Sequence, residues 1–174
     1  GSLIQKGEYL NNKLHGIVEA YFENGQVKKK STFESGRLSG EAIEYFNNGK
    51  PKLLFAYVNG KQNGPAKSYY ETGEISSDYT YLNGVISGIY TTYYKNGNKE
   101  WIYNYQNGLK NGAYQHLNSK GQLVEEGSYV DGINNGARNT YYDSGKPKEI
   151  QKFELGAKIG VNKTFFQTGE LMWE

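Results

Sequence analysis

Apolar and polar residues recur along this chain with a period of 24 residues. The stretch from Gly40 to Asn63, GEAIEYFNNGKPKLLFAYVNGKQN, shows one period. It contains an opening glycine, an aromatic pair, a first turn at Asn48-Gly49, a third aromatic residue and a second turn at Asn59-Gly60. Self-similarity of this regularity predicts a repeat architecture.

Glycines and aromatic residues carry the period without insertion or deletion. The opening glycines are Gly16, Gly40, Gly64, Gly88, Gly112, Gly136 and Gly160. The third aromatic residues are Tyr9, Phe33, Tyr57, Tyr81, Tyr105, Tyr129 and Phe153. The repeats therefore start at 16, 40, 64, 88, 112, 136 and 160, after a half-repeat over residues 3–15.

Each repeat has the pattern of a β-hairpin. Asn48-Gly49 can supply the two positive-φ residues of a type I′ turn, and the flanking runs are rich in β-branched and aromatic residues. The second connection, such as Asn83–Gly88, predicts a longer link to the next hairpin. The fold class we predict is all-β: an elongated, single-domain array over residues 1–174, in which 24-residue β-hairpin repeats form one long twisted antiparallel meander sheet.

The register of a hairpin decides which side chains share a face. A two-residue turn at Asn48-Gly49 predicts four opposed pairs: Phe46 with Pro51, Glu44 with Leu53, Ala42 with Phe55, and Gly40 with Tyr57. One face then collects the rings, and each third aromatic residue covers an opening glycine. A slip of one residue would exchange the two faces.

The fifth repeat departs from the pattern. Leu117-Asn118 stands where an aromatic pair is expected, and Glu125, Glu126 and Gly127 stand where the fourth repeat has apolar residues. The ring-bearing face loses apolar surface there. Two interpretations stay open: a looser repeat held by its neighbours, or a hinge or local polar binding notch.

Composition and candidate chemistry do not predict catalysis. The net charge of +2, from 20 basic and 18 acidic residues, is too balanced for a nucleic-acid footprint. The chain has no cysteine, and His15 and His116 lie four repeats apart, so we expect no metal site and no cofactor. Glu125 and Glu126 are adjacent strand residues that point to opposite faces, so they do not form a catalytic pair. We expect no enzyme.

Tyrosines of the aromatic pairs are the candidate binding residues. One sheet cannot cover both of its own faces, so rings on the polar side stay partly exposed. Tyrosine combines an apolar ring with a polar tip, which suits protein or glycan partners. The candidate partner-binding surface consists of Tyr45, Tyr69, Tyr93 and Tyr141.

The aromatic pair, the NG turn, the aromatic-x-NG motif and the final glycine of YFNNGKPKLLFAYVNGKQNG together resemble the MORN repeat. The pattern over residues 7–174 is most similar to the bacterial MORN-variant repeats of the YwqK-type antitoxin-like family. The resemblance implies a hairpin-stacked sheet that contacts protein or lipid and has no enzymatic activity. The 24-residue period, slightly longer than the usual MORN repeat, and the fifth repeat depart from it.

Three functions compete at this stage. The first is a non-enzymatic scaffold that binds another protein. The second is a carbohydrate or cell-wall binding module, although glycan-binding repeats rely on tryptophan and this chain has only Trp101 and Trp173. The third is a lipid-surface module, which the balanced charge disfavours. The compartment stays open between export, the cell surface and the cytoplasm, and we expect the chain to be part of a longer or processed protein.

Overall fold

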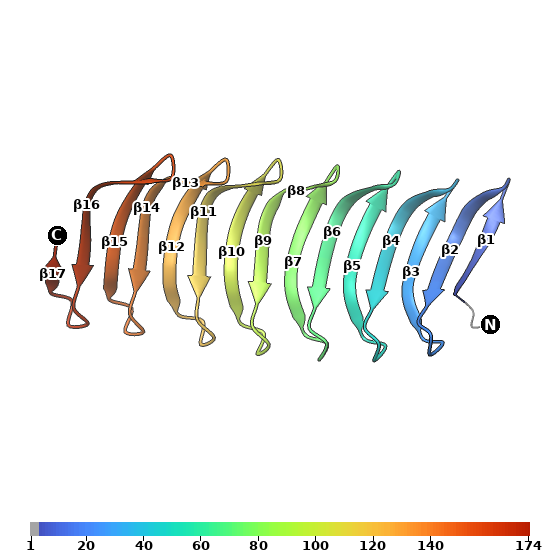
Figure 1. The fold of residues 1–174 in the computed structure, drawn as a ribbon, viewed down its shortest axis with the longest axis horizontal. Helices are drawn as coiled ribbons and strands as arrows, with labels where there is room; N and C mark the ends of the chain where they lie inside the picture. Colours follow the sequence, from blue (N-terminus) through green and yellow to red (C-terminus); the bar gives the residue numbers. More distant parts are fainter. Residues whose placement is uncertain (1–3) are drawn as a thin grey trace. The chain divides into compact units, whose positions relative to one another are not determined.

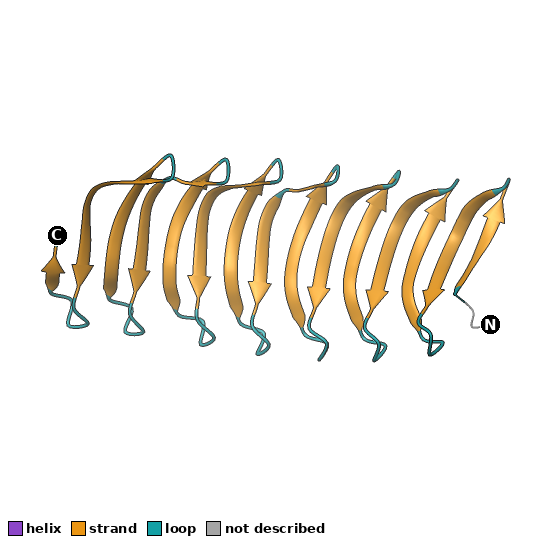
Figure 2. Cartoon of the chain, viewed as in Figure 1, coloured by secondary structure: helices purple, strands orange, loops and turns teal. Residues whose placement is uncertain are grey.

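The computed structural model describes residues 4–174 as strands joined by turns (Figure 1). Figure 2 shows strands and loops only, and the described residues include no helix that could cross a membrane. Contacts divide the chain into two compact units, Gly1–Val85 and Ile86–Glu174. The predicted single array over residues 1–174 therefore stays a prediction. Leu3, the first residue of the predicted half-repeat, lies outside the described residues.

Unit 1 is an antiparallel meander. Its strands are β1 (Gln5–Leu10), β2 (Lys13–Tyr21), β3 (Val27–Glu34), β4 (Arg37–Tyr45), β5 (Pro51–Val58), β6 (Lys61–Tyr69) and β7 (Ile75–Leu82), and the two-residue strand β8 (Val85–Ile86) follows. Each strand from β1 to β7 pairs with the next one along the chain.

Unit 2 repeats the same arrangement. Its strands are β9 (Gly88–Tyr93), β10 (Lys99–Gln106), β11 (Leu109–Leu117), β12 (Leu123–Val130), β13 (Ile133–Asn134), β14 (Gly136–Tyr141), β15 (Pro147–Glu154), β16 (Ala157–Phe165) and β17 (Leu171–Trp173). β12 pairs with both β13 and β14, which are two parts of one interrupted strand. The predicted fold class, an all-β antiparallel meander of hairpin repeats, is confirmed.

The predicted register is confirmed in the middle of the hairpin. Gly40 lies opposite Tyr57 and Glu44 opposite Leu53, and the other opening glycines of the paired strands also face an aromatic residue. These glycines have positive φ, for example 87° at Gly40, and each sits where the strand bulges against its other neighbour. Glycine is required there because other L-residues adopt this backbone conformation at a cost.

The predicted geometry of the two turns is wrong in both cases. Only Gly49 of Asn48-Gly49 has positive φ, and Phe46 accepts a bond from the Gly49 N–H at 3.0 Å. The first turn is therefore a three-residue loop ending in a glycine bulge, with Tyr45 rather than Phe46 opposite Pro51. A second bulge before Leu53 restores the predicted register.

The type I′ geometry belongs to the second turn. Asn59 and Gly60 have φ of 50° and 81°, as this turn requires, and the connection is tight rather than long. The Gly60 N–H also donates to the Leu38 carbonyl at 2.7 Å, so each second turn is tied to the preceding repeat. Corresponding bonds join Gly36 to Leu14, Gly84 to Gln62, Gly108 to Ile86, Gly132 to Lys110 and Gly156 to Asn134.

Within residues 4–174, Leu155 is the second-turn residue whose type suits its backbone least. Its φ is 47°, whereas the same place in earlier repeats holds serine, asparagine or aspartate, and its side chain is 80% exposed. We expect Leu155→Asn to stabilise unit 2 by ~1 kcal/mol and to raise its Tm by about 4–8 °C in thermal denaturation. Asn59→Leu should lower the stability of unit 1 to a similar extent. Equal melting temperatures of Leu155→Asn and wild type would show that leucine is not strained at this position.

The two faces of each unit differ in chemistry. The ring face carries Phe55, Tyr57, Ala66, Tyr79 and Tyr81 in unit 1 and Trp101, Tyr103, Tyr105, Tyr114 and Tyr129 in unit 2. The polar face carries Glu19, Lys30, Lys67 and Asp78 in unit 1 and Asn104, Gln115, Glu126 and Asn139 in unit 2. The most buried apolar residues, including Ala42, Ala66 and Tyr114, lie on the ring face, which therefore forms the core.

Candidate binding surface

The rings on the ring face of unit 2 are already in contact with one another. Trp101 stacks on His116, with ring centroids 3.9 Å apart and planes 5° from parallel, and on Tyr103 at 5.3 Å. The Lys110 Nζ lies 3.5 Å from the centroid of the Tyr103 ring. These ring surfaces are thus occupied by neighbours within the chain, as expected for a core rather than a binding platform.

The ring face of the fifth repeat is well packed at Tyr114. In the second and third repeats a small residue on the first strand faces a ring on the second: Ala42 faces Phe55, and Ala66 faces Tyr79. The fifth repeat reverses the sizes, because Tyr114 on β11 faces Gly127 on β12. Tyr114 is only 3% exposed. The expectation of a looser repeat is therefore corrected: the ring is moved to the other strand and fills the space above a glycine.

A charge-assisted network follows from this exchange. The Tyr114 hydroxyl donates to Glu125 at 2.7 Å, and Arg138 donates to the two carboxylate oxygens of Glu125 at 3.0 and 2.8 Å. A two-pronged pair of this kind is both stronger and more directional than a single contact. Glu125 thus holds together β11, β12 and β14 on the ring face.

The pKa values in and beside this network shift in opposite directions, downward for the carboxylate and upward for the phenols. Burial alone would raise the pKa of Glu125, but the hydrogen bonds from Arg138 and Tyr114, with the charge of Arg138, outweigh it and lower that pKa. Burial, followed by the hydrogen bond to Glu125, raises the pKa of Tyr114. Burial, followed by the neighbouring Tyr129, raises the pKa of Tyr103. The network is therefore built around an ionised carboxylate and neutral phenols.

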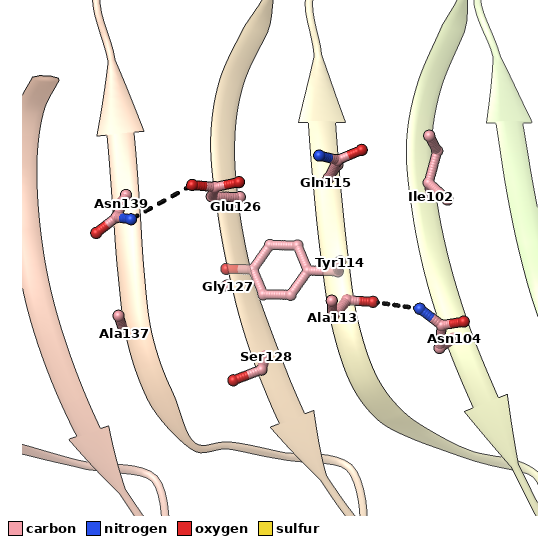
Figure 3. A pocket seen from close by; sticks show the side chains of 10 residues that line it. All are labelled: Ile102, Asn104, Ala113, Tyr114, Gln115, Glu126, Gly127, Ser128, Ala137 and Asn139. Atoms are coloured by element: carbon pink, nitrogen blue, oxygen red, sulfur yellow. Dashed lines mark hydrogen bonds between the residues drawn. The ribbon is translucent and has the colours of Figure 1, made fainter. Parts of the chain in front are cut away.

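The polar face of unit 2 has an open hollow of about 370 Å³ over β10, β11, β12 and β14 (Figure 3). Its lining consists of polar-face residues, Ile102, Asn104, Ala113, Gln115, Glu126, Ser128, Ala137 and Asn139, together with Tyr114 and Gly127, which the register assigns to the ring face. Ala113 and Ala137 occupy the position held by Ile17 and Ile89 in other repeats, so small side chains leave this space unfilled.

Glu126 is the charged residue of the hollow. Its Oε1 accepts a hydrogen bond from the Tyr141 hydroxyl at 2.6 Å and a longer one from Asn139 Nδ2 at 3.4 Å (Figure 3). Tyr141 itself lines a second hollow of about 280 Å³ with Gln122, Leu123, Asp143, Ser144 and Gly145. Tyr141 therefore connects the two hollows, because it lines the second and its hydroxyl is bound to Glu126 of the first.

The four candidate tyrosines are half-buried at the ends of four strands. Tyr45 ends β4 and Tyr69 ends β6 in unit 1, while Tyr93 ends β9 and Tyr141 ends β14 in unit 2. Alternation from Glu44 places Tyr45 on the polar face, and the contact with Glu126 places Tyr141 there. One of them, Tyr141, donates a hydrogen bond to a lining residue of the hollow, Glu126. Their role in binding stays a prediction.

Sequence reasoning left open a polar binding notch in the fifth repeat, where Glu126 lies, but it did not identify Gln115, Ala113 or Ala137. The signal was present in the repeats, because two alanines replace larger residues at one position and a glutamate stands opposite a glutamine. Glu125 and Glu126 do point to opposite faces, as their different partners show. Among residues 4–174 no group of three or more histidine, aspartate or glutamate side chains could hold a metal ion.

Comparison with known proteins identifies a repeat type. Residues 14–35, 38–59 and 62–83, all in unit 1, match the family model described as MORN repeat variant. No curated protein matches the sequence. One similar solved structure is "Crystal structure of GtfA/B complex bound to UDP and GlcNAc", at 14% identity and a TM-score of 0.30. The match covers 71% of this chain and 23% of that one, so the chain spans less than a quarter of that protein's length.

Proposed function

We propose that this chain, three repeats of which match the MORN repeat variant, is a non-enzymatic module that binds another protein through its polar face. MORN repeats are generally protein- or membrane-interaction repeats. The observation that carries the proposal is the hollow on the polar face of unit 2, which none of its own side chains fills. Concave sites with a few convergent polar groups are typical binding sites.

A glycan partner receives less support. Sugars stack on free faces of aromatic rings, and the ring surfaces of Trp101 and Tyr103 are in contact with His116, Lys110 and each other. The hollow itself is lined mainly by amides and small residues. A protein surface can use both features, because it offers backbone donors and acceptors and apolar side chains together.

A membrane partner also receives less support. Anionic lipid attracts clusters of uncompensated lysine and arginine. On the polar face of unit 1, Lys30 forms an ion pair with Glu19 at 3.8 Å, and Lys67 lies opposite Asp78 in the register. Acids thus balance these lysines.

The test is capture of a partner by the intact chain and two double variants. Ala113→Arg with Ala137→Arg should fill the hollow with long side chains. Ile17→Arg with Val161→Arg adds the same charges at the equivalent exposed positions of other repeats, where the present side chains are 51% and 58% exposed. We expect a protein from the native cells, identified by mass spectrometry, to be retained by wild type and by the control pair and lost from the hollow pair.

Two assays on the same three proteins address the rivals. Sedimentation with vesicles containing phosphatidylserine and a glycan array should both be negative. The proposal would be contradicted if wild type bound the vesicles or a glycan and if Ala113→Arg with Ala137→Arg captured protein as well as wild type does.

A further inference from the structure

The geometry points to the kind of partner: we propose that the hollow receives the side chain of an arginine, or less tightly of a lysine, from an extended segment of the partner protein. Gln115 and Glu126 would accept its hydrogen bonds. This inference rests on the proposed function and adds the chemistry of the residue that is recognised.

The first support is a comparison of one opposed pair across the repeats. Gln115 on β11 lies directly opposite Glu126 on β12. At the equivalent place the other pairs are Glu19 with Lys30, Ile43 with Leu54, Lys67 with Asp78, Thr91 with Ile102, and Asn139 with Ile150. In those pairs a carboxylate has an opposed lysine or there is no charge. The fifth repeat presents a carboxylate opposite a neutral amide.

The second support is the hydrogen bonding of this pair. Tyr141 and Asn139 both donate to the Oε1 atom of Glu126. Within residues 4–174 the Oε2 atom and the amide of Gln115 have no hydrogen-bond partner, and no lysine or arginine forms an ion pair with Glu126. The Tyr141 bond holds the carboxylate in one orientation while leaving one oxygen available. An oriented acceptor beside a second acceptor suits a cationic donor.

The third support is space and charge around the pair. The side chains of Ala113 and Ala137 are short and leave space in the hollow, so a long side chain can reach the Glu126 carboxylate. Asp143, in the adjoining hollow beyond Tyr141, is the other charged lining residue, and it is also acidic. Lys152 lies opposite Ala137 in the register, outside the lining, and would repel a basic group on that side. The favoured position for a cation is therefore above β11 and β12.

Arginine fits this arrangement better than lysine. The guanidinium group holds its donors in a rigid planar fork, and one edge can serve a carboxylate oxygen and an adjacent amide oxygen together. An ammonium group is a single point of charge with a stronger hold on water. The partner segment would be extended, because the hollow runs over neighbouring strands whose side chains stand apart at strand spacing.

The test uses acetyl-Thr-Val-Arg-Val-Thr-amide and its analogue with glutamine in place of arginine. Binding to the full chain is followed by NMR shifts of the Ala113, Gly127 and Ala137 amides. We expect the glutamine peptide to bind about tenfold more weakly, as for loss of a charged hydrogen bond. Glu126→Gln should weaken the arginine peptide to a similar extent. Gln115→Lys should do the same while the protein melts at or above the wild-type temperature, because the new lysine pairs with Glu126.

The controls separate this inference from the proposed function. Lys67→Gln places a glutamine opposite Asp78 in unit 1. This site lies beside Pro65 and lacks the two alanines, so we expect that it does not bind the peptide. Equal binding of the two peptides to wild type, or undiminished binding to Gln115→Lys, would overturn the inference. Suppose that Gln115→Lys still captures the cellular partner, whereas Ala113→Arg with Ala137→Arg does not. The proposed function then stands, and the inference of an arginine ligand fails. If Gln115→Lys and the double arginine variant both capture the partner, the proposed function and the inference both fail.

Discussion

Replacing Gly127 with alanine is expected to destabilise unit 2 by about 2 kcal/mol. A Cβ atom at this position would lie 2.7 Å from Cε1 and 2.9 Å from the hydroxyl oxygen of Tyr114. The ring is 3% exposed and its hydroxyl is bound to Glu125, so moving it away breaks packing and a hydrogen bond together. Gly127 does not have positive φ, so the loss measures side-chain contact rather than backbone strain.

The measurement is urea denaturation followed by tryptophan fluorescence. Both tryptophans, Trp101 and Trp173, lie in unit 2, so the signal reports on that unit. A double-mutant cycle supplies the control: Gly127→Ala in a Tyr114→Ala background should cost almost nothing, because the ring that it meets is gone. Equal costs in the two backgrounds would show that the close approach of ring and glycine is not the cause.

Replacing Arg138 with methionine is expected to destabilise unit 2 by about 2 kcal/mol at pH 7. The change leaves the Glu125 carboxylate, which is 17% exposed, with only the Tyr114 hydroxyl as a donor. The value is below that for a fully buried pair, because the Arg138 side chain is 38% exposed and water screens it. Lys29→Met is the matched control: its 3.1 Å pair with Glu44 is 40% and 35% exposed, and its loss should matter much less.

The pH dependence of stability should change with the same substitution. The pKa of Glu125 is lowered in the folded protein, so this group stabilises the fold above its unfolded pKa, near 4.3, and the contribution is lost as pH falls through the lower folded value. In Arg138→Met that pKa should rise, and the acid-side loss contributed by Glu125 should shrink or reverse. Urea midpoints measured from pH 7 to pH 3 provide the comparison. Parallel curves for wild type and variant would contradict the role assigned to Glu125.

The period of 24 residues was sufficient to predict the hairpins and the middle register. Opening glycines and third aromatic residues fix that register independently of the turns, which is why Gly40 and Tyr57 were paired correctly. The turn types could not be predicted from local sequence, because Asn-Gly suits both. At the first turn, Asn48 accepts from the Lys50 N–H and donates to the Glu71 carbonyl of the next repeat, at 2.9 and 3.0 Å. That second bond depends on the neighbouring repeat.

The candidate site was harder to predict than the fold. The tyrosines were identified by type and position, but the hollow results from missing side-chain volume at Ala113 and Ala137. Such an absence is visible only when repeats are compared position by position. The contact of Arg138 with Glu125 is diagonal between β12 and β14, so direct opposition in the register does not reveal it.

The hydrogen bonds from each second turn to the preceding repeat have a mechanical consequence. Within unit 1 the Gly60 N–H is held by Leu38, and the Gly84 N–H by Gln62, so a repeat cannot detach without releasing its neighbour's turn. Under tension applied to the chain ends, such a ladder should yield repeat by repeat. Each rupture would free 24 residues, or roughly 80 Å of extended chain, giving a force trace with evenly spaced steps.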